Sequence, residues 1–209
     1  MMQLLLVRHG QTEENVRQVL QGQSPGHLTA QGYAEARELA AQLEKLRGQV
    51  ACVFSSDLER AVRTAEIIAG VLQLPVLREP LLRERDFGEL TGRSIAEVRA
   101  LSEMPPTVES VEAMRERARL FLERVARAYN GGTVLAVSHG LYLRGLQGVW
   151  AGCPLQEIPP MRNCEVRTLQ LELPASPSSP TACSFHPQGA ASPAGSSFAE
   201  SLSLTDGEA

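Results

Sequence analysis

Short apolar segments alternate with segments of helical periodicity along most of this chain, and that alternation constrains its fold more than any other feature. Five segments are predicted to be strands, namely 4–7, 50–55, 75–77, 133–137 and 167–173. Four are predicted to be helices, namely 29–48, 57–72, 109–129 and 141–150. Apolar strands that alternate with helices are typical of a mostly parallel sheet covered on both faces. The sequence therefore predicts an α/β fold, in which the last segment, alternating in polarity, is a half-exposed edge strand.

The composition of the chain changes after Pro174. Residues 175–209 contain no Lys or Arg and are rich in Ser, Pro, Ala and Gly. Such a segment cannot bury enough apolar surface to offset the conformational entropy that it would lose on ordering. We therefore expect one folded domain in residues 1–174 and a low-complexity, disordered tail in residues 175–209.

The charged residues give no sign of a nucleic-acid surface. All 20 Lys and Arg lie before Pro174, together with most of the 24 acidic residues, so residues 1–174 are close to neutral. A chain without a broad basic surface is not expected to bind nucleic acid. The apolar run after Gln3 is interrupted by Arg8, which makes it too short for a signal peptide or a membrane span.

The four cysteines form neither a CxxC pair nor a Cys/His cluster with zinc spacing. This pattern is typical of free thiols in a reducing compartment. Together with the short apolar run at the start of the chain, it predicts a soluble, cytoplasmic protein that does not associate with membranes.

Arg8, His9 and Gly10 directly follow the first predicted strand. A histidine can attack phosphorus as a covalent nucleophile. A neighbouring guanidinium can hold two phosphate oxygens, and a glycine lets the backbone come close to the phosphate. For this tripeptide alone, an ordinary histidine at a strand end is an equally good interpretation, because short motifs often arise by chance.

Three further side chains suit the same chemistry. Arg60 lies one turn into the helix predicted after 50–55, where the helix N-terminus favours anions. Glu84 could donate a proton to a leaving alkoxide, and we expect the arginines on either side of it to point toward other partners. His139 follows the strand predicted at 133–137 and could donate a hydrogen bond to phosphate. Each also has a simpler interpretation: Arg60 as a solvated arginine, Glu84 as part of a surface charge cluster, and His139 as a histidine whose hydrogen bonds the protein satisfies.

Parallel strands of an α/β sheet bring their carboxyl ends to one edge, where ligands bind. Because His9 and His139 each follow a predicted strand, we expect both to face the same crevice. The order of the Arg-His-Gly start, the Ser-Ser-Asp-Leu-x-Arg-Ala-x-x-Thr-Ala segment from Ser55, the Leu-Arg-Glu-Arg segment around Glu84 and the late Ser-His-Gly resembles the histidine phosphatase superfamily, which includes the cofactor-dependent phosphoglycerate mutases. The resemblance covers residues 3–173.

The resemblance implies a three-layer α/β/α sandwich, with a catalytic domain in residues 1–174 of the small-phosphatase kind. It implies that His9 is the nucleophile and Glu84 the general acid, with no metal or other cofactor. The implied substrate is a small phosphorylated metabolite, such as a sugar phosphate or a phosphoglycerate. The residues that the resemblance implies for binding it are Arg8, Asn15, Gln21, Gly22, Arg60 and His139.

Two segments depart from the family pattern. His27 stands where the family usually continues with Pro-Leu-Thr, and an exposed loop histidine is its simplest interpretation. The segment 105–110 lacks the glycine pair that is common before the Glu-Ser that it contains. The shape of the loop there is therefore not predicted.

Two other functions are compatible with the same motifs. The first is phosphoryl transfer of the phosphoglycerate mutase type, but the mutases carry a long basic insertion after the acid, whereas only about twenty residues separate Glu84 from Pro105. The second is a non-catalytic protein that binds a phosphorylated ligand on the same fold. A pure binder needs no nucleophile and acid together, so hydrolysis of phosphate monoesters is the favoured prediction.

Overall fold

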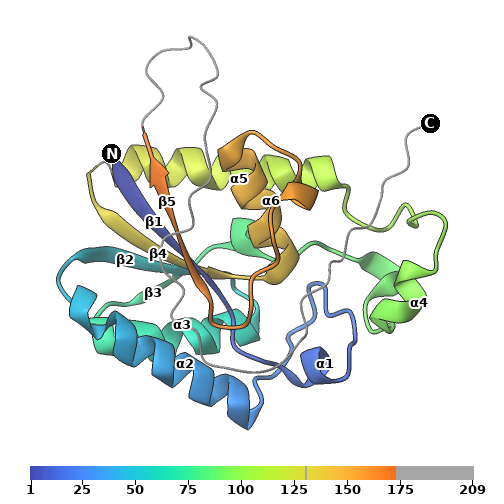
Figure 1. Cartoon of the computed structure of the whole chain (residues 1–209), viewed down its shortest axis with the longest axis horizontal. Helices are drawn as coiled ribbons and strands as arrows, with labels where there is room; N and C mark the ends of the chain where they lie inside the picture. The colour runs from blue at the N-terminus through green and yellow to red at the C-terminus, as the bar shows by residue number, and fades with distance from the viewer. Residues whose placement is uncertain (130, 173–209) are drawn as a thin grey trace.

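The computed structural model describes residues 1–129 and 131–172, which contain a five-stranded sheet with the strand order β3-β2-β4-β1-β5. The four strands β1, β2, β3 and β4 pair in parallel, and β5 runs antiparallel to β1 at one edge (Figure 1). The predictions of a mostly parallel sheet and of an edge strand near the end of the domain are thus confirmed. The strands are β1 (Met2–Arg8), β2 (Val50–Ser55), β3 (Val76–Arg78), β4 (Thr133–Ser138) and β5 (Val166–Leu171).

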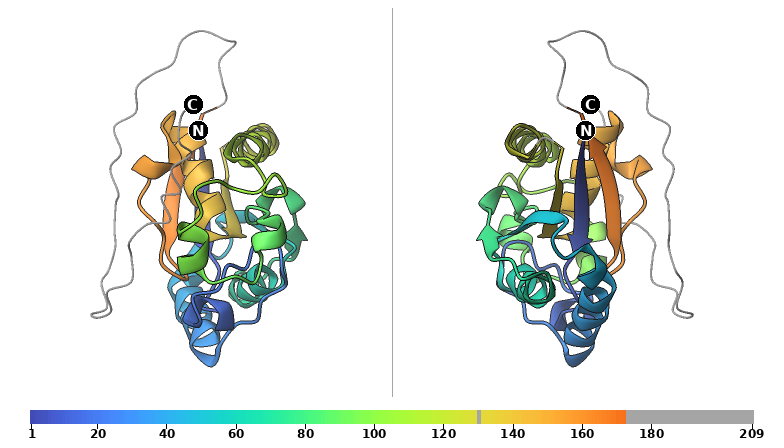
Figure 2. Two further views of the ribbon diagram at one scale, coloured as in Figure 1. Left: turned by 90° about the vertical axis from the view of Figure 1, so that its right-hand side faces the viewer. Right: turned by 90° about the vertical axis from the view of Figure 1, so that its left-hand side faces the viewer.

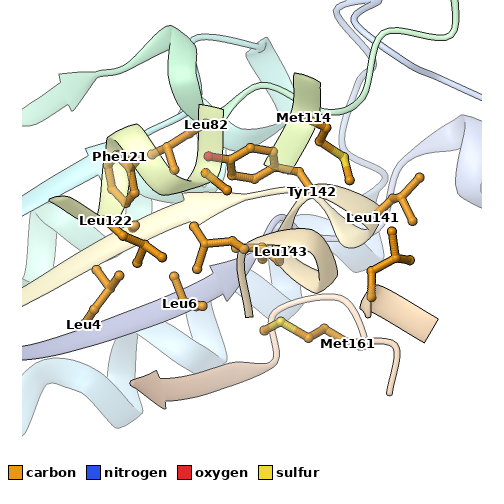
Figure 3. Close-up of a cluster of buried hydrophobic side chains, with 14 of the residues drawn as sticks. Leu4, Leu6, Leu82, Met114, Phe121, Leu122, Leu141, Tyr142, Leu143 and Met161 are labelled. Carbon is orange, nitrogen blue, oxygen red and sulfur yellow. The ribbon is translucent and has the colours of Figure 1, made fainter. Parts of the chain in front are cut away.

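Two helices cover each face of the sheet, which confirms the three-layer sandwich (Figures 1 and 2). Because side chains alternate across a strand, Leu4 and Leu6 of β1 join the apolar cluster on one face, and Leu5 and Val7 join the cluster on the other. The first cluster is closed by α5 (Val111–Ala128) and α6 (Gly140–Ala151), and the second by α2 (Ala30–Leu43) and α3 (Glu59–Leu72). Figure 3 shows side chains of the first cluster, among them Phe121, Tyr142 and Leu143.

The ends of the predicted helices follow local capping. Thr29 caps α2 as predicted, since its side chain accepts a hydrogen bond from the backbone N–H of Gly32. Helix α2 ends at Leu43, five residues before the predicted stop at Gly48. The chain then passes through η1 (Glu44–Leu46), and Gly48, with a φ of +79°, follows the end of this 3-10 turn. Helices α3 and α5 begin two residues later than predicted, at Glu59 and Val111.

Short elements escaped prediction because each is shorter than two helical turns, too short to show the periodicity of an amphipathic helix. They are α1 (Glu13–Val16), α4 (Ile95–Arg99), η2 (Pro80–Leu82), η3 (Gly88–Leu90) and η4 (Leu155–Glu157). The predicted disorder of residues 175–209 lies outside the described residues. Within residues 1–129 and 131–172, Cys52, Cys153 and Cys164 are free thiols, and no helix is long and apolar enough to cross a membrane.

Candidate active site

The strand-end motifs converge at the carboxyl edge of the sheet. Neighbouring parallel strands β1 and β4 bring His9 and His139 together, with ring centroids 5.2 Å apart, although only His9 lines the cavity that both were expected to face. A cavity of about 160 Å³ opens at this edge. Of the predicted site residues, His139 does not line it, and those that do are Arg8, His9, Asn15, Gln21, Gly22, Arg60 and Glu84.

His9 is buried and held in one tautomer. Its Nδ1 lies 2.7 Å from the carbonyl oxygen of Gly10, which can only accept, so Nδ1 carries the proton and Nε2 keeps its lone pair. Burial, with the positive charges of Arg60 and Arg8, holds the pKa of His9 well below the usual 6.5. The imidazole is therefore neutral at physiological pH, as a nucleophile must be.

The loop that carries His9 is fixed by side chains that sequence reasoning did not single out. Asn163 donates to the backbone carbonyl of His9 at 2.9 Å, and the N–H of Gly10 donates to Thr64 Oγ1 at 3.1 Å. A Cβ built on Gly10 would lie 2.6 Å from the carbonyl oxygen of Gly32. The glycine is thus required by the close approach of α2, a reason different from the predicted approach to phosphate.

Arg8 presents an unused donor to the site. Its Nη1 donates to the carbonyl of Met161 at 2.6 Å, whereas its buried Nε has no hydrogen-bond partner among the described residues. A Cβ at Gly140 would lie 3.3 Å from that Nε, so the glycine of the Ser-His-Gly motif makes room for the guanidinium. Burial lowers the pKa of Arg8, and the charge of Glu84 opposes the shift.

Arg60 is 1% exposed and lies at the start of α3, as predicted. Its Nη2 donates to the carbonyl of Gly22 at 2.7 Å, and its Nη1 donates to those of Ser24 at 2.6 Å and Pro25 at 3.2 Å. These bonds tie the segment that begins at Gln21, whose first two residues were predicted to bind the substrate, to a buried cation. Burial lowers the pKa of Arg60 to about 10, so the side chain stays charged at neutral pH.

His139 lies behind Arg60. Its Nδ1 accepts a hydrogen bond from Arg60 Nε at 3.1 Å, so its Nε2 carries the proton and donates to Ser56 Oγ at 2.8 Å. Burial, with the charge of Arg60, holds the pKa of His139 well below 6.5. In this structure both ring nitrogens are used by the protein, and His139 orients Arg60.

Glu84 lies in the segment between η2 and η3, and its carboxylate reaches the first turn of α6. Oε1 accepts from the backbone N–H of Tyr142 at 2.8 Å and of Arg85 at 2.9 Å, and Oε2 accepts from that of Leu141 at 3.2 Å. A helix N-terminus is a favourable place for a carboxylate. The carboxyl group is thereby held at the wall of the cavity.

The two arginines beside Glu84 point toward other partners, as predicted. Arg83 donates from Nε and Nη2 to the carboxylate of Asp57 at 2.7 and 2.6 Å, and these bonds lower the pKa of Asp57. Arg85 donates from Nε to the backbone carbonyl of Glu109 at 2.6 Å. His27 is also as predicted, since its side chain is 72% exposed and it does not line the cavity.

Asn15 and Gln21 complete the polar part of the cavity. Asn15 Oδ1 accepts from the backbone N–H of Thr12 at 3.1 Å and from Asn163 at 3.4 Å, which turns its amide NH₂ toward other groups. Gln21 is 9% exposed, and its Oε1 has no hydrogen-bond partner among the described residues.

The rest of the cavity lining is mostly apolar and was not predicted. It includes one charged side chain, Arg144, which is buried and donates from Nε to the carbonyl of Ile158 at 2.8 Å. The apolar lining comes from Val19, Leu20, Phe87, Ile95, Leu141, Pro160 and Met161. Within the described ranges, no group of three or more His, Cys, Asp or Glu side chains is placed to hold a metal ion.

The site thus brings a neutral histidine, two buried arginines and a carboxyl group to one cavity. The sequence model of the histidine phosphatase superfamily (branch 1) matches residues 4–174. The chain therefore belongs to the histidine phosphatase superfamily. Its similarity to known members identifies it as an enzyme of this superfamily.

The relatives of this chain include probable phosphoglycerate mutases as well as phosphatases. The chain is 34% identical over 181 residues to a probable phosphoglycerate mutase GpmB of Proteus mirabilis, which covers 79% of this chain and 83% of the relative. It is 35% identical over 143 residues to an uncharacterized phosphatase PhoE of Bacillus subtilis, which covers 68% and 73%. The solved structure of a mycobacterial glucosyl-3-phosphoglycerate phosphatase in complex with VO₃ superposes on this chain with a TM-score of 0.74 and 26% sequence identity. The superposition covers 80% of this chain and 90% of that one.

Proposed function

We propose that this protein hydrolyses small phosphate monoesters through a phosphohistidine on His9, with Glu84 as general acid and base and without a metal ion. One observation carries the proposal: the unprotonated Nε2 of a buried, neutral His9 shares a cavity with Arg8, Arg60 and Glu84. The arginines supply fixed positive charge for the phosphate, and the Arg8 Nε–H, which has no partner among the described residues, supplies a donor for one of its oxygens.

In the first step, the lone pair of His9 Nε2 forms a bond to phosphorus while the bond from phosphorus to the ester oxygen breaks. Protonated Glu84 gives its proton to the departing alkoxide, which leaves as an alcohol. The three backbone N–H groups around Glu84 then stabilise the carboxylate that remains.

In the second step, the Glu84 carboxylate takes a proton from a water molecule as the water oxygen attacks phosphorus. The bond from phosphorus to His9 Nε2 breaks, and inorganic phosphate leaves. His9 is again neutral and Glu84 again protonated, so the cycle closes without any further reactant.

Mutase-type transfer would use a second hydroxyl group in place of water, and it requires groups that hold a second phosphate. Among the described residues in the span 85–104, only Phe87 and Ile95 line the cavity, and both are apolar. This lining favours hydrolysis. A binding protein would need no nucleophile with a fixed tautomer, which argues against the non-catalytic alternative.

The test is to assay the purified protein on phosphoglycerates, sugar phosphates and p-nitrophenyl phosphate, and to trap the phosphorylated protein with labelled substrate. We expect release of inorganic phosphate and a label that His9→Ala abolishes. His27→Ala is the matched control, since His27 is exposed and outside the cavity. Label on the His9→Ala protein, or transfer to a second hydroxyl in place of release, would refute the proposal.

A further inference from the structure

Glu84 lies in a segment whose backbone must be held by other residues. The segment 83–87 runs between two short 3-10 helices, and a proton donor must keep a distance of about 3 Å from the atom that it protonates. The carboxylate is fixed by α6, but its backbone lies against α5. Resting on the proposed role of Glu84, we propose that Arg117 of α5, paired with Glu109, is the positioning residue that sets the place of this proton donor.

Arg117 donates hydrogen bonds to three backbone carbonyls at and near Glu84. Its Nη1 donates to the carbonyl oxygens of Leu81 at 2.8 Å and Arg83 at 3.2 Å, and its Nη2 donates to that of Glu84 at 3.4 Å. Arg117 does not line the cavity, so it acts through Glu84 and touches no substrate.

Glu109 fixes the orientation of Arg117. The two side chains form a two-pronged ion pair, with Nε to Oε1 at 2.7 Å and Nη2 to Oε2 at 2.8 Å, and they are only 20% and 14% exposed. Glu109 Oε2 also accepts from the N–H of Asp86, and its backbone N–H donates to the Asp86 carbonyl. Burial opposes the charge of Arg117, but Glu109 outweighs it and raises the pKa of the guanidinium.

The same guanidinium contacts the other anchor of Glu84. The Arg117 Cζ lies 5.0 Å from the ring centroid of Tyr142, whose backbone N–H holds the Glu84 carboxylate. Figure 3 shows the Tyr142 ring among the buried apolar side chains, close to Leu82 and Met114. Arg117 therefore links the backbone of Glu84 to the residue that binds its side chain.

Lysine cannot reproduce this arrangement, because one ammonium group has no planar fork that can serve a carboxylate and three carbonyls together. Arg117→Lys keeps the charge, so it tests geometry alone. Glu109→Gln keeps one acceptor for Arg117 and serves as a second, milder variant. Arg124→Gln is the matched control: Arg124 also lies on α5 and donates to Glu79 just before η2, at 2.6 Å, but it contacts none of the three carbonyls.

The readout is the ratio of kcat/KM for an alkyl phosphate to that for p-nitrophenyl phosphate, whose leaving group, p-nitrophenolate, departs with little help from an acid. General acids contribute about 10²–10⁴-fold, so we expect Arg117→Lys to lower this ratio by about tenfold or more. Glu109→Gln should lower the ratio less, and Arg124→Gln should leave it unchanged. In the Glu84→Gln background, Arg117→Lys should not lower the ratio further.

A merely structural role would lower kcat/KM for both substrates in the same proportion and leave their ratio unchanged. An unchanged ratio would therefore overturn the inference. Thermal unfolding of each variant shows whether it is folded; if Arg117→Lys is not, Glu109→Gln decides by the same ratio. If Glu84→Gln lowers the ratio but neither of these variants does, this inference alone fails. If Glu84→Gln leaves the ratio unchanged, Glu84 is not the acid and both proposals fail.

Discussion

Gly10→Ala tests whether the packing of α2 determines the position of the nucleophile. The Cβ of the variant would lie 2.6 Å from the carbonyl oxygen of Gly32 and 3.1 Å from its carbon. Carbon and oxygen atoms do not normally approach within about 3.3 Å, so the His9 loop and α2 must separate by about 0.7 Å. Both atoms at Gly32 belong to the backbone, and no side-chain rotation can relieve the contact.

Two effects of opposite sign decide the stability of this variant. Replacing glycine restricts the unfolded chain and alone would stabilise the protein by about 0.4–1 kcal/mol. Forcing an extra methyl group into a packed site costs about 1–3 kcal/mol. The second effect is larger, so we expect a net loss of about 1–2 kcal/mol, which lowers Tm by about 2–8 °C for a domain of this size.

The activity of Gly10→Ala should fall together with its stability, because Gly10 directly follows His9 in the chain. A misplacement of about 1 Å can cost about 10²-fold, so kcat should drop at least about tenfold. Thermal unfolding without ligand and steady-state kinetics measure both effects. The control is Gly70→Ala in α3, where a Cβ meets nothing within 4 Å; it should gain about 1 kcal/mol and keep full activity. A Gly10→Ala protein as stable as wild type would refute the packing argument and leave the approach of phosphate as the reason for the glycine.

Three further outcomes are expected from the buried groups. The pKa values of His9 and His139 lie well below 6.5, so below that pH the unfolded chain binds protons that the folded chain does not. The free energy of unfolding should therefore be highest above pH 6.5 and fall below it by up to about 1.4 kcal/mol per pH unit for each histidine. Urea unfolding between about pH 7 and 5 that shows no such fall would contradict this. Tyr142→Phe should stabilise the protein by about 1 kcal/mol, because the buried hydroxyl has no partner among the described residues, and a lower Tm would show that it does have one. Activity should survive excess EDTA, since Arg8 and Arg60 carry the positive charge at the cavity, and loss that one divalent metal restores would disprove it.

The layout of the site was predictable because the sheet is parallel. His9 and His139 each come directly after an apolar strand, and parallel strands deliver the residues at their carboxyl ends to one edge. Arg60 was placed by the same rule, as a residue in the first turn after β2. Strand periodicity and strand order thus fix which residues meet, even where individual contacts are not known.

The contacts themselves depend on pairs that are distant in sequence and have no periodic signal. Thr64 and Asn163 hold the His9 loop from α3 and from the segment before β5. Thr64 belongs to the motif that begins at Ser55, but the motif does not show that Thr64 contacts Gly10, and nothing in its local sequence marks Asn163. Arg144 is one of the few polar residues in the mostly apolar helix α6, and nothing in that sequence shows that it lines the cavity. Gly10 was predicted correctly as a required glycine but for a different reason, because its neighbour Gly32 is more than twenty residues away.

His139 shows how the hydrogen-bond pattern limits what a single ring can do. Its Nδ1 accepts from Arg60 only while the ring is neutral, and a protonated ring would place a second positive charge 3.1 Å from Arg60 Nε. The lowered pKa of His139 keeps that bond intact, so the geometry of Arg60 depends on the burial of its neighbour. The one N–H of the neutral ring is donated to Ser56. To donate to phosphate directly, His139 would have to give up its hydrogen bond to Ser56. The two hydrogen bonds of its ring therefore support a role in orienting Arg60, and the contact between His139 and phosphate stays a prediction.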